Sequence, residues 1–183
     1  KELKEIFKIP IIGVIEAGAR TAINTTKSNE IGVIGTKATI KSEKYIEEIK
    51  LFNPKVKVFQ KACPLFVPAV EEGILSGKLV NQIIKTYLDD FEEKIDTLIL
   101  GCTHYPLLKD AISKIYPDIK IVDPAKETAL DLKSILQKNK FLKNDALKNE
   151  EVNYYVTDGQ EKFKEIGIMF LEENIKKVEL VKL

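Results

Sequence analysis

The sequence predicts an α/β fold in which a mostly parallel sheet is flanked by helices. Short runs rich in valine and isoleucine recur along the chain, and each is followed by a longer stretch whose apolar residues have helical spacing. This alternation is typical of βα units, in which each helix crosses back over the sheet and the strands run parallel. With 183 residues, 44% of them apolar, the chain has enough apolar surface for a buried core.

The expected strands are short and β-branched, as in strands that are buried on both faces. They are PIIGVI (10–15), EIGVIGT (30–36), VKVF (56–59), DTLILG (96–101), IKIVD (119–123), VNYYVTD (152–158) and VELVKL (178–183). The expected helices each carry one apolar face. They cover 16–26, 38–52, 78–91 and 105–116. A further helix is expected after Asp123, which is a plausible cap with Pro124 in the first turn, and another after VNYYVTD.

Two stretches lie outside this pattern. Residues 60–77 contain Pro64 and Pro68, which argue against a regular element, so we expect a functional or covering loop there. Residues 138–151 are polar and predict a surface connection. We expect a main lobe at 9–122 and a trailing segment at 123–183.

Charge and cysteine content narrow the classes of function. The chain has 29 basic and 28 acidic residues, and the lysines are scattered, so nucleic acid is not expected as the main partner. Two cysteines are too few for a disulfide framework. The sequence has neither a secretory signal nor a long apolar run, so no membrane association is expected and a reducing cytoplasm is the default location.

The chain's single histidine, His104, stands two residues after Cys102, just where the strand TLILG ends. Ligands of parallel sheets bind beyond the carboxyl ends of the strands, and backbone N–H groups at a following helix favour a thiolate there. The alternative is that Cys102 is a small buried apolar residue and His104 a surface residue, and the spacing fits this equally. A zinc site is a weaker hypothesis, because it needs at least three protein ligands, and a metal is therefore not expected.

Four segments resemble glutamate racemases, of the cofactor-independent aspartate/glutamate racemase superfamily. They are IPIIGVIEAGAR (9–20), IGVIGTKATIKS (31–42), CPLFVPAVEEG (63–73) and LILGCTHYPLL (98–108). The resemblance implies a two-lobed, pseudo-symmetric enzyme in which two cysteines face opposite sides of the α-carbon of glutamate. One thiolate removes the α-proton, the other thiol returns a proton, and no pyridoxal phosphate or other cofactor takes part. The product D-glutamate would supply peptidoglycan, and such enzymes are often homodimers.

The resemblance also implies roles for individual residues. Cys102 matches the second catalytic cysteine, His104 the histidine that assists it, and Glu71 its acidic partner, with Glu72 as the alternative. Substrate carboxylate contacts are implied for Thr103, Thr36 and Thr39. For Thr36 a plain helix cap is an equal alternative. Cys63, which precedes a proline, is expected to pack in the core.

The chain departs from the family because it lacks the segment that carries the first catalytic cysteine. By the resemblance it covers about the latter two thirds of such an enzyme and holds one half-site. The segment after 122 would then pack on the other lobe. Two alternatives remain open: a catalytically silent lobe that binds an amino acid, and a racemase for another amino acid such as aspartate, although His104 replaces the glutamate found there in aspartate enzymes.

Overall fold

The computed structural model describes residues 2–91, 93–142, 152–171, 173 and 175–182. The chain divides into two compact units, Lys1–Leu142 and Lys143–Leu183. The sequence predicted a division after residue 122 instead. The structure differs because the helix that follows packs on the first unit, with Asp131 on it accepting a 2.6 Å hydrogen bond from Arg20.

A four-stranded parallel sheet forms the centre of the first unit, which confirms the predicted fold class. Its strands are β1 (Glu30–Gly35), β2 (Lys57–Ala62), β3 (Thr97–Leu100) and β4 (Lys120–Val122), in the order β2-β1-β3-β4. The helices are α1 (Glu2–Ile6), α2 (Val14–Thr25), α3 (Lys37–Lys41), α4 (Lys44–Phe52), α5 (Phe66–Glu71), α6 (Lys78–Leu88), α7 (Lys109–Ile115) and α8 (Pro124–Lys138). Two 3-10 helices, η1 (Asp89–Phe91) and η2 (Tyr105–Leu108), complete the unit.

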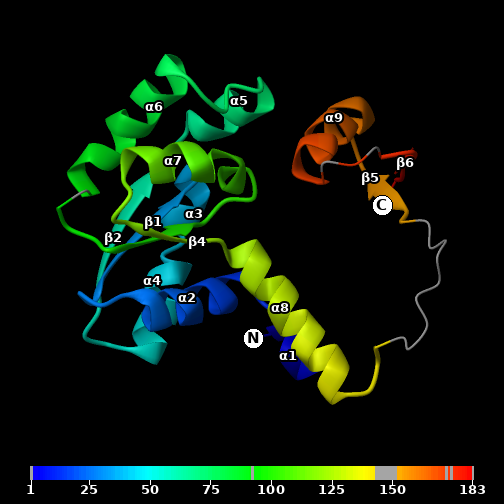
Figure 1. The fold of residues 1–183 in the computed structure, drawn as a ribbon. Coiled ribbons are helices and arrows are strands. Elements are labelled where there is room, and N and C mark those ends of the chain that lie inside the picture. Colours follow the sequence, from blue (N-terminus) through cyan, green and yellow to red (C-terminus); the bar gives the residue numbers. More distant parts are fainter. Residues whose placement is uncertain (1, 92, 143–151, 172, 174, 183) are drawn as a thin grey trace. The chain divides into compact units, whose positions relative to one another are not determined.

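Helices cover both faces of this sheet, with α6 and α7 on one side and α2 and α4 on the other (Figure 1). The strands supply alternate side chains to two cores, as the period of a strand requires. On β3, Ile99 packs with α2 and α4, whereas Leu98 and Leu100 pack with α5, α6 and α7. All three are essentially buried, which explains why the sequence of this strand is continuously apolar.

The strand predicted at 10–15 is wrong. Residues 10–13 form no regular element, and Val14 and Ile15 are already the first residues of α2. Ile15 packs against the core that lies between the sheet and helices α2 and α4. β-Branched residues favour a strand only where a sheet offers them a partner, and here helical packing outweighs that preference.

The loop predicted at 60–77 is also partly wrong, since β2 continues to Ala62 and α5 spans Phe66–Glu71. Pro68 is the third residue of α5. The N–H groups of a first helical turn have no intrahelical acceptor, so a proline there removes no hydrogen bond. The prolines therefore place the start of a short helix rather than exclude one.

The other predicted helices of the first unit are confirmed, three of them with a change of geometry. The helix expected at 78–91 is α6 followed by η1. The helix expected at 38–52 is interrupted between α3 and α4, where Glu43 has the left-handed φ of 53°. The helix expected at 105–116 begins as η2 before it continues as α7. The tighter first turn directly follows the candidate site.

The second unit is small. A two-stranded parallel sheet joins β5 (Tyr154–Val156) to β6 (Val178–Leu180), and α9 (Gln160–Leu171) connects them, which confirms both predicted strands. Val152 and Phe170 are exposed, at 69% and 39%. Of the connection predicted at 138–151, residues 143–151 lie outside the described part.

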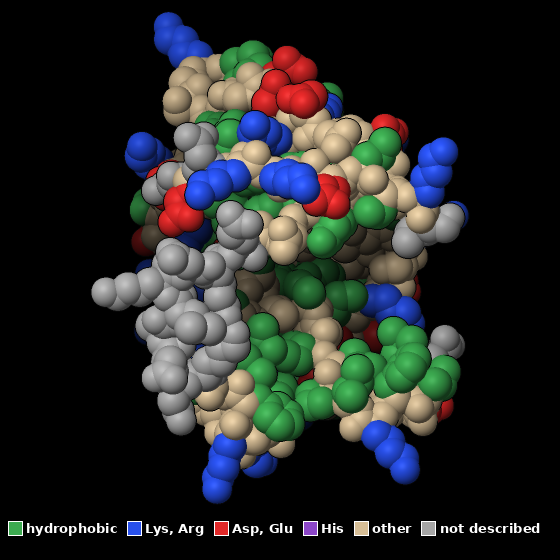
Figure 2. All heavy atoms as spheres, turned by 90° about the vertical axis from the view of Figure 1, so that its right-hand side faces the viewer, with side chains coloured by type: hydrophobic (Ala, Val, Ile, Leu, Met, Phe, Trp, Pro, Cys, Tyr) green, Lys and Arg blue, Asp and Glu red, His purple; other side chains and the backbone are tan. Residues whose placement is uncertain are grey.

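Charges are mixed over the surface. Figure 2 shows basic and acidic side chains spread among one another on the face that it presents, with apolar side chains between them. Within the described residues, no helix has both the length and the apolar character of a membrane span.

Candidate active site

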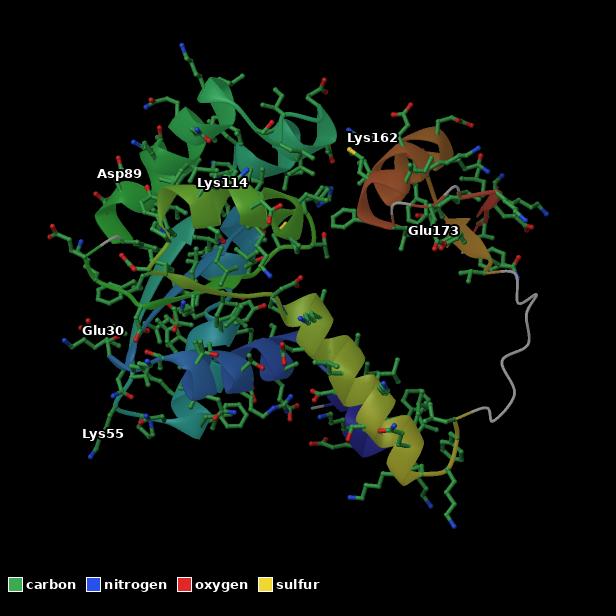
Figure 3. The ribbon with its side chains drawn as sticks, viewed as in Figure 1. Glu30, Lys55, Asp89, Lys114, Lys162 and Glu173 are labelled. Carbon is green, nitrogen blue, oxygen red and sulfur yellow. The ribbon has the colours of Figure 1, made fainter. Side chains whose placement is uncertain are left out.

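The carboxyl ends of the parallel strands bring the predicted site residues to one edge of the sheet. Thr36 follows β1, Cys63 follows β2 and Cys102 follows β3. Glu30, labelled in Figure 3, is the first residue of β1 and marks the opposite edge. The site therefore forms where parallel α/β sheets place their ligands.

Cys102 stands on a tight turn between β3 and η2. Gly101 extends the sheet by donating its N–H to the Ile34 carbonyl at 2.7 Å, and the N–H of Tyr105 closes the turn on the Cys102 carbonyl at 3.2 Å. A Cβ at position 101 would lie 2.8 Å from the Ile34 oxygen, so the backbone approach requires glycine. The turn leaves Cys102 partly exposed.

His104 lies between a carboxylate and a hydroxyl. Its Nε2 is 3.6 Å from Oε1 of Glu71, and its Nδ1 is 3.2 Å from Oγ1 of Thr103. The His104 and Glu71 side chains are about one quarter exposed, at 24% and 25%. Contacts at both ring nitrogens orient an imidazole for proton transfer.

The structure separates the two candidate acidic partners. Glu71 is the last residue of α5 and its carboxylate faces His104. Glu72 follows as the C-cap of α5 and is exposed. Of the two carboxylates, the one recorded against His104 is therefore that of Glu71.

Thr36 and Thr39 form a hydroxyl pair at the end of β1. Thr36 caps α3, its Oγ1 accepting the N–H of Thr39 at 3.2 Å, and the two hydroxyl oxygens are 3.0 Å apart. The Thr39 methyl lies against both strand ends, since a Cβ on Gly35 would be 2.9 Å from it and one on Gly101 3.6 Å. Thr36 is therefore a cap, and its partner Thr39 lies near the turn that carries Cys102.

Cys63 has a different environment from Cys102. It is completely buried in the core, as the sequence analysis expected. Burial raises the pKa of its thiol to about 12, although Lys61 acts in the opposite direction. Cys63 is therefore protonated at neutral pH and is not available as a base.

Sequence reasoning missed two tyrosines at this edge. Tyr45 is 4% exposed, and a Cβ on Gly101 would lie 3.0 Å from its ring, so it packs directly beneath the Cys102 turn. Burial, with smaller contributions from Cys102 and Asp123, raises its pKa to about 12. Tyr105 is also buried, and its hydroxyl bonds to the Cys63 carbonyl. At both positions, the one indication in the sequence is that a tyrosine is present where a phenylalanine would pack as well.

A cavity elsewhere in the first unit lies between α1, α2 and α8. Arg20 on its wall pairs with Asp131 at 2.6 Å, and Glu16 pairs with Lys4 at 3.2 Å. In the described part of the chain, no three His, Cys, Asp or Glu side chains come together as metal ligands would.

Comparison with known proteins gives the same family from sequence and from structure. Residues 1–131 match the model of the family described as Asp/Glu/Hydantoin racemase. A curated relative, the glutamate racemase of Persephonella marina, is 48% identical over 99% of this chain and 68% of its own length.

Solved structures agree. Glutamate racemase from Francisella tularensis, in complex with D-glutamate, has 43% identity and a TM-score of 0.86, covering 96% of this chain and 65% of that one. Glutamate racemase isoform RacE1 from Bacillus anthracis has 39% identity and a TM-score of 0.89, covering 100% of this chain and 68% of that one. The chain thus spans about two thirds of the length of these proteins.

Proposed function

This chain belongs to the Asp/Glu/Hydantoin racemase family, and we propose that it carries one half of the active site of a glutamate racemase. The observation that supports this most directly is the turn with Cys102 and His104 at the end of β3, faced by Glu71. Its relatives at 39–48% identity are glutamate racemases. The activity is the interconversion of L- and D-glutamate.

In the proposed reaction Cys102 acts as a thiolate base for one enantiomer. It takes the α-proton, the C–H bond breaks and its electron pair remains on the α-carbon. A second thiol on the opposite face then gives its own proton to that carbon, so configuration inverts and the second sulfur is left as the thiolate. The reverse reaction exchanges the two roles. No external oxidant or reductant is required, and the proposal includes no cofactor.

His104 and Glu71 assist this half-reaction. The imidazole belongs to the residue two positions after Cys102, and the Glu71 carboxylate at 3.6 Å fixes its orientation. We assign His104 to proton transfer with Cys102 and Glu71 to holding His104. Such general acid–base groups typically contribute about 10²–10⁴-fold to a rate.

The hydroxyl groups near the turn are suited to the anionic ends of the substrate. Thr103, Thr36 and Thr39 all stand at the carboxyl ends of β1 and β3. Hydroxyls and backbone N–H groups at strand-to-helix turns are good donors to carboxylates. We therefore assign these three threonines to binding the carboxylates of glutamate.

The second thiol is not supplied by Cys63, the chain's other cysteine, because Cys63 is fully buried in the core. The two-base proposal therefore places that thiol outside these 183 residues.

The wider proposals follow from the same assignment: the protein works in the cytoplasm, supplies D-glutamate for peptidoglycan, and acts as a homodimer.

The test is α-proton exchange in heavy water. The protein as its gene encodes it is incubated with L-glutamate and separately with D-glutamate, while NMR follows α-deuteration and circular dichroism follows inversion. Deuteration with inversion that is lost in Cys102→Ser is the expected result. A folded protein that neither deuterates nor inverts glutamate would overturn the proposal, and faster turnover of aspartate would replace its substrate.

A second candidate is a lobe that binds an amino acid without chemistry. It is favoured by one observation, that of the two cysteines Cys63 is buried and Cys102 alone is partly exposed. Calorimetry with glutamate on the same sample separates the two: binding without any α-deuteration supports the silent lobe, whereas binding with deuteration supports the racemase.

A further inference from the structure

The His104–Glu71 pair joins two elements that are distant in the sequence. Glu71 is the last residue of α5, which follows β2, whereas His104 lies on the turn after β3. These two strands are not neighbours, since β1 lies between them. Some contact across the edge of the sheet must therefore set the distance between the two side chains.

Tyr105 makes such a contact. It follows His104 directly and is completely buried. Its hydroxyl donates a 2.9 Å hydrogen bond to the carbonyl of Cys63, and the same carbonyl accepts the N–H of Phe66 at 3.1 Å. Phe66 is the first residue of α5. The Cys63 carbonyl therefore accepts one hydrogen bond from the residue next to His104 and one from the helix that carries Glu71.

A ring contact reinforces the hydrogen bond. The rings of Tyr105 and Phe66 pack edge to face, with centroids 5.1 Å apart and an interplanar angle of 72°. Phe66 packs in the same manner against Tyr87 of α6, at 5.4 Å and 84°. The start of α5 is thus fixed on two sides, and aromatic pairs of this geometry prefer one arrangement.

The hydroxyl of Tyr105 remains a donor over the physiological pH range. Burial raises its pKa well above the usual value, and the neighbouring Cys63 and Cys102 act in the same direction. From Phe66 to Glu71 the chain is helical, so a shift at the start of α5 is carried about 7.5 Å along the axis to its end.

We propose that Tyr105 is a positioning residue that holds α5 against the Cys102 turn and thereby sets the distance between Glu71 and His104. Its hydroxyl bond to the Cys63 carbonyl and its ring contact with Phe66 perform this task together. The catalytic meaning of the inference rests on the proposed function, but the coupling itself does not.

The test reads the imidazole NMR signals of His104, the only histidine among these 183 residues, and identifies them by their loss in His104→Gln. The shift of these signals caused by Glu71→Gln is measured in the native background and again in Tyr105→Phe, which retains the ring and loses the hydroxyl. The expected result is a clear shift in the native background and less than half of it with Tyr105→Phe. Equal shifts in both backgrounds, or no shift in the native one, would overturn the inference.

Tyr116→Phe is the matched control, because it removes another tyrosine hydroxyl bond in the same core, the one to Asp89 at 2.5 Å. It is expected to leave the Glu71→Gln shift unchanged, and a reduction as large as that of Tyr105→Phe would indicate general loosening instead. If Tyr105→Phe does not fold, Phe66→Leu replaces it, with a smaller reduction expected and an unchanged shift counting against the inference. The measurement needs neither glutamate nor turnover, so it is independent of the proposed activity.

Discussion

Strand β3 has polar groups at both of its ends, and the two ends use them differently. At the amino end, Asp96 accepts hydrogen bonds from the Thr26 hydroxyl at 2.6 Å, from the N–H of Lys27 at 2.6 Å and of Ser28 at 2.7 Å, and from Thr97 at 2.9 Å. These bonds tie the loop after α2 to the sheet. The carboxylate is fully occupied by contacts within the fold.

At the carboxyl end, Cys102, Thr103 and His104 follow the same strand and stay partly or largely exposed. His104 has its contacts to Glu71 and Thr103, while Cys102 is partly exposed and packs against the edge of the core. The difference shows that polar groups at one end of a parallel strand stabilise the fold, whereas those at the other end are left accessible to a ligand.

The largest expected effect is at the carboxyl end. Cys102→Ser removes the proposed base and should lower the rate of α-proton exchange by about 10²–10⁴-fold, while the free energy of unfolding changes by no more than about 0.5 kcal/mol. Exchange is measured by NMR in heavy water and unfolding by urea titration. If Cys102→Ser exchanges the α-proton at the native rate, the residues at the carboxyl end of β3 do not take part in the reaction.

The second prediction compares the two thiols, each of which follows a strand of the same sheet. Iodoacetamide should modify Cys102 at least about 100-fold faster than Cys63 in the folded chain, because Cys63 is buried and its pKa is raised to about 12. Peptide mass spectrometry gives both rates. In urea the rates should converge, and similar rates in the folded chain would contradict the difference in burial.

The third prediction concerns the amino end. Desolvation raises the pKa of Asp96, but the bonds from Thr26, Ser28, Lys27 and Thr97 outweigh it and hold the pKa well below its usual value. The stabilisation is therefore present above the unfolded pKa of about 3.9 and is lost as the pH falls below it. Asp96→Ala should lower the free energy of unfolding at pH 7 by about 2 kcal/mol.

Urea titrations between pH 3 and pH 7 check this sign, and the native chain should lose more stability on acidification than Asp96→Ala does. The Asp96→Ala chain should alkylate at Cys102 as fast as the native chain, since the change lies at the other end of β3. Equal acid sensitivity of the two chains would mean that Asp96 does not anchor the loop.

The smallest expected effect is at the end of β1. Thr36→Ala removes the cap of α3 and should cost about 1 kcal/mol of unfolding free energy, whereas Thr36→Ser should retain it. Thermal unfolding measures both variants. If Thr36 also binds a substrate carboxylate, Thr36→Ala raises the KM for glutamate and Thr36→Ser does not, and a KM unchanged in both variants would leave Thr36 as a cap alone.

Most elements of the fold were predictable from the sequence, because β1, β3 and β4 are apolar after a polar first residue and the helices after them have one apolar face. The exceptions have local causes. Val14 and Ile15 have the composition of a strand but form the start of α2, where Ile15 packs against the core and Val14 is exposed. Pro68 suggested a loop, yet it lies in a helical turn where its missing N–H is not needed.

For the candidate site, the position of Cys102 and His104 together after a buried strand was predictable from the sequence, because residues two apart in the chain remain close in any fold. For Thr36 the sequence left a helix cap and a carboxylate contact as equal alternatives, and the structure shows the cap. The tertiary structure was needed to place Glu71 rather than Glu72 against His104, to leave Cys102 partly exposed, and to bond Tyr105 to the Cys63 carbonyl. These facts depend on how strands β2, β1 and β3 lie side by side, and no local pattern specifies which side chains then meet across their ends.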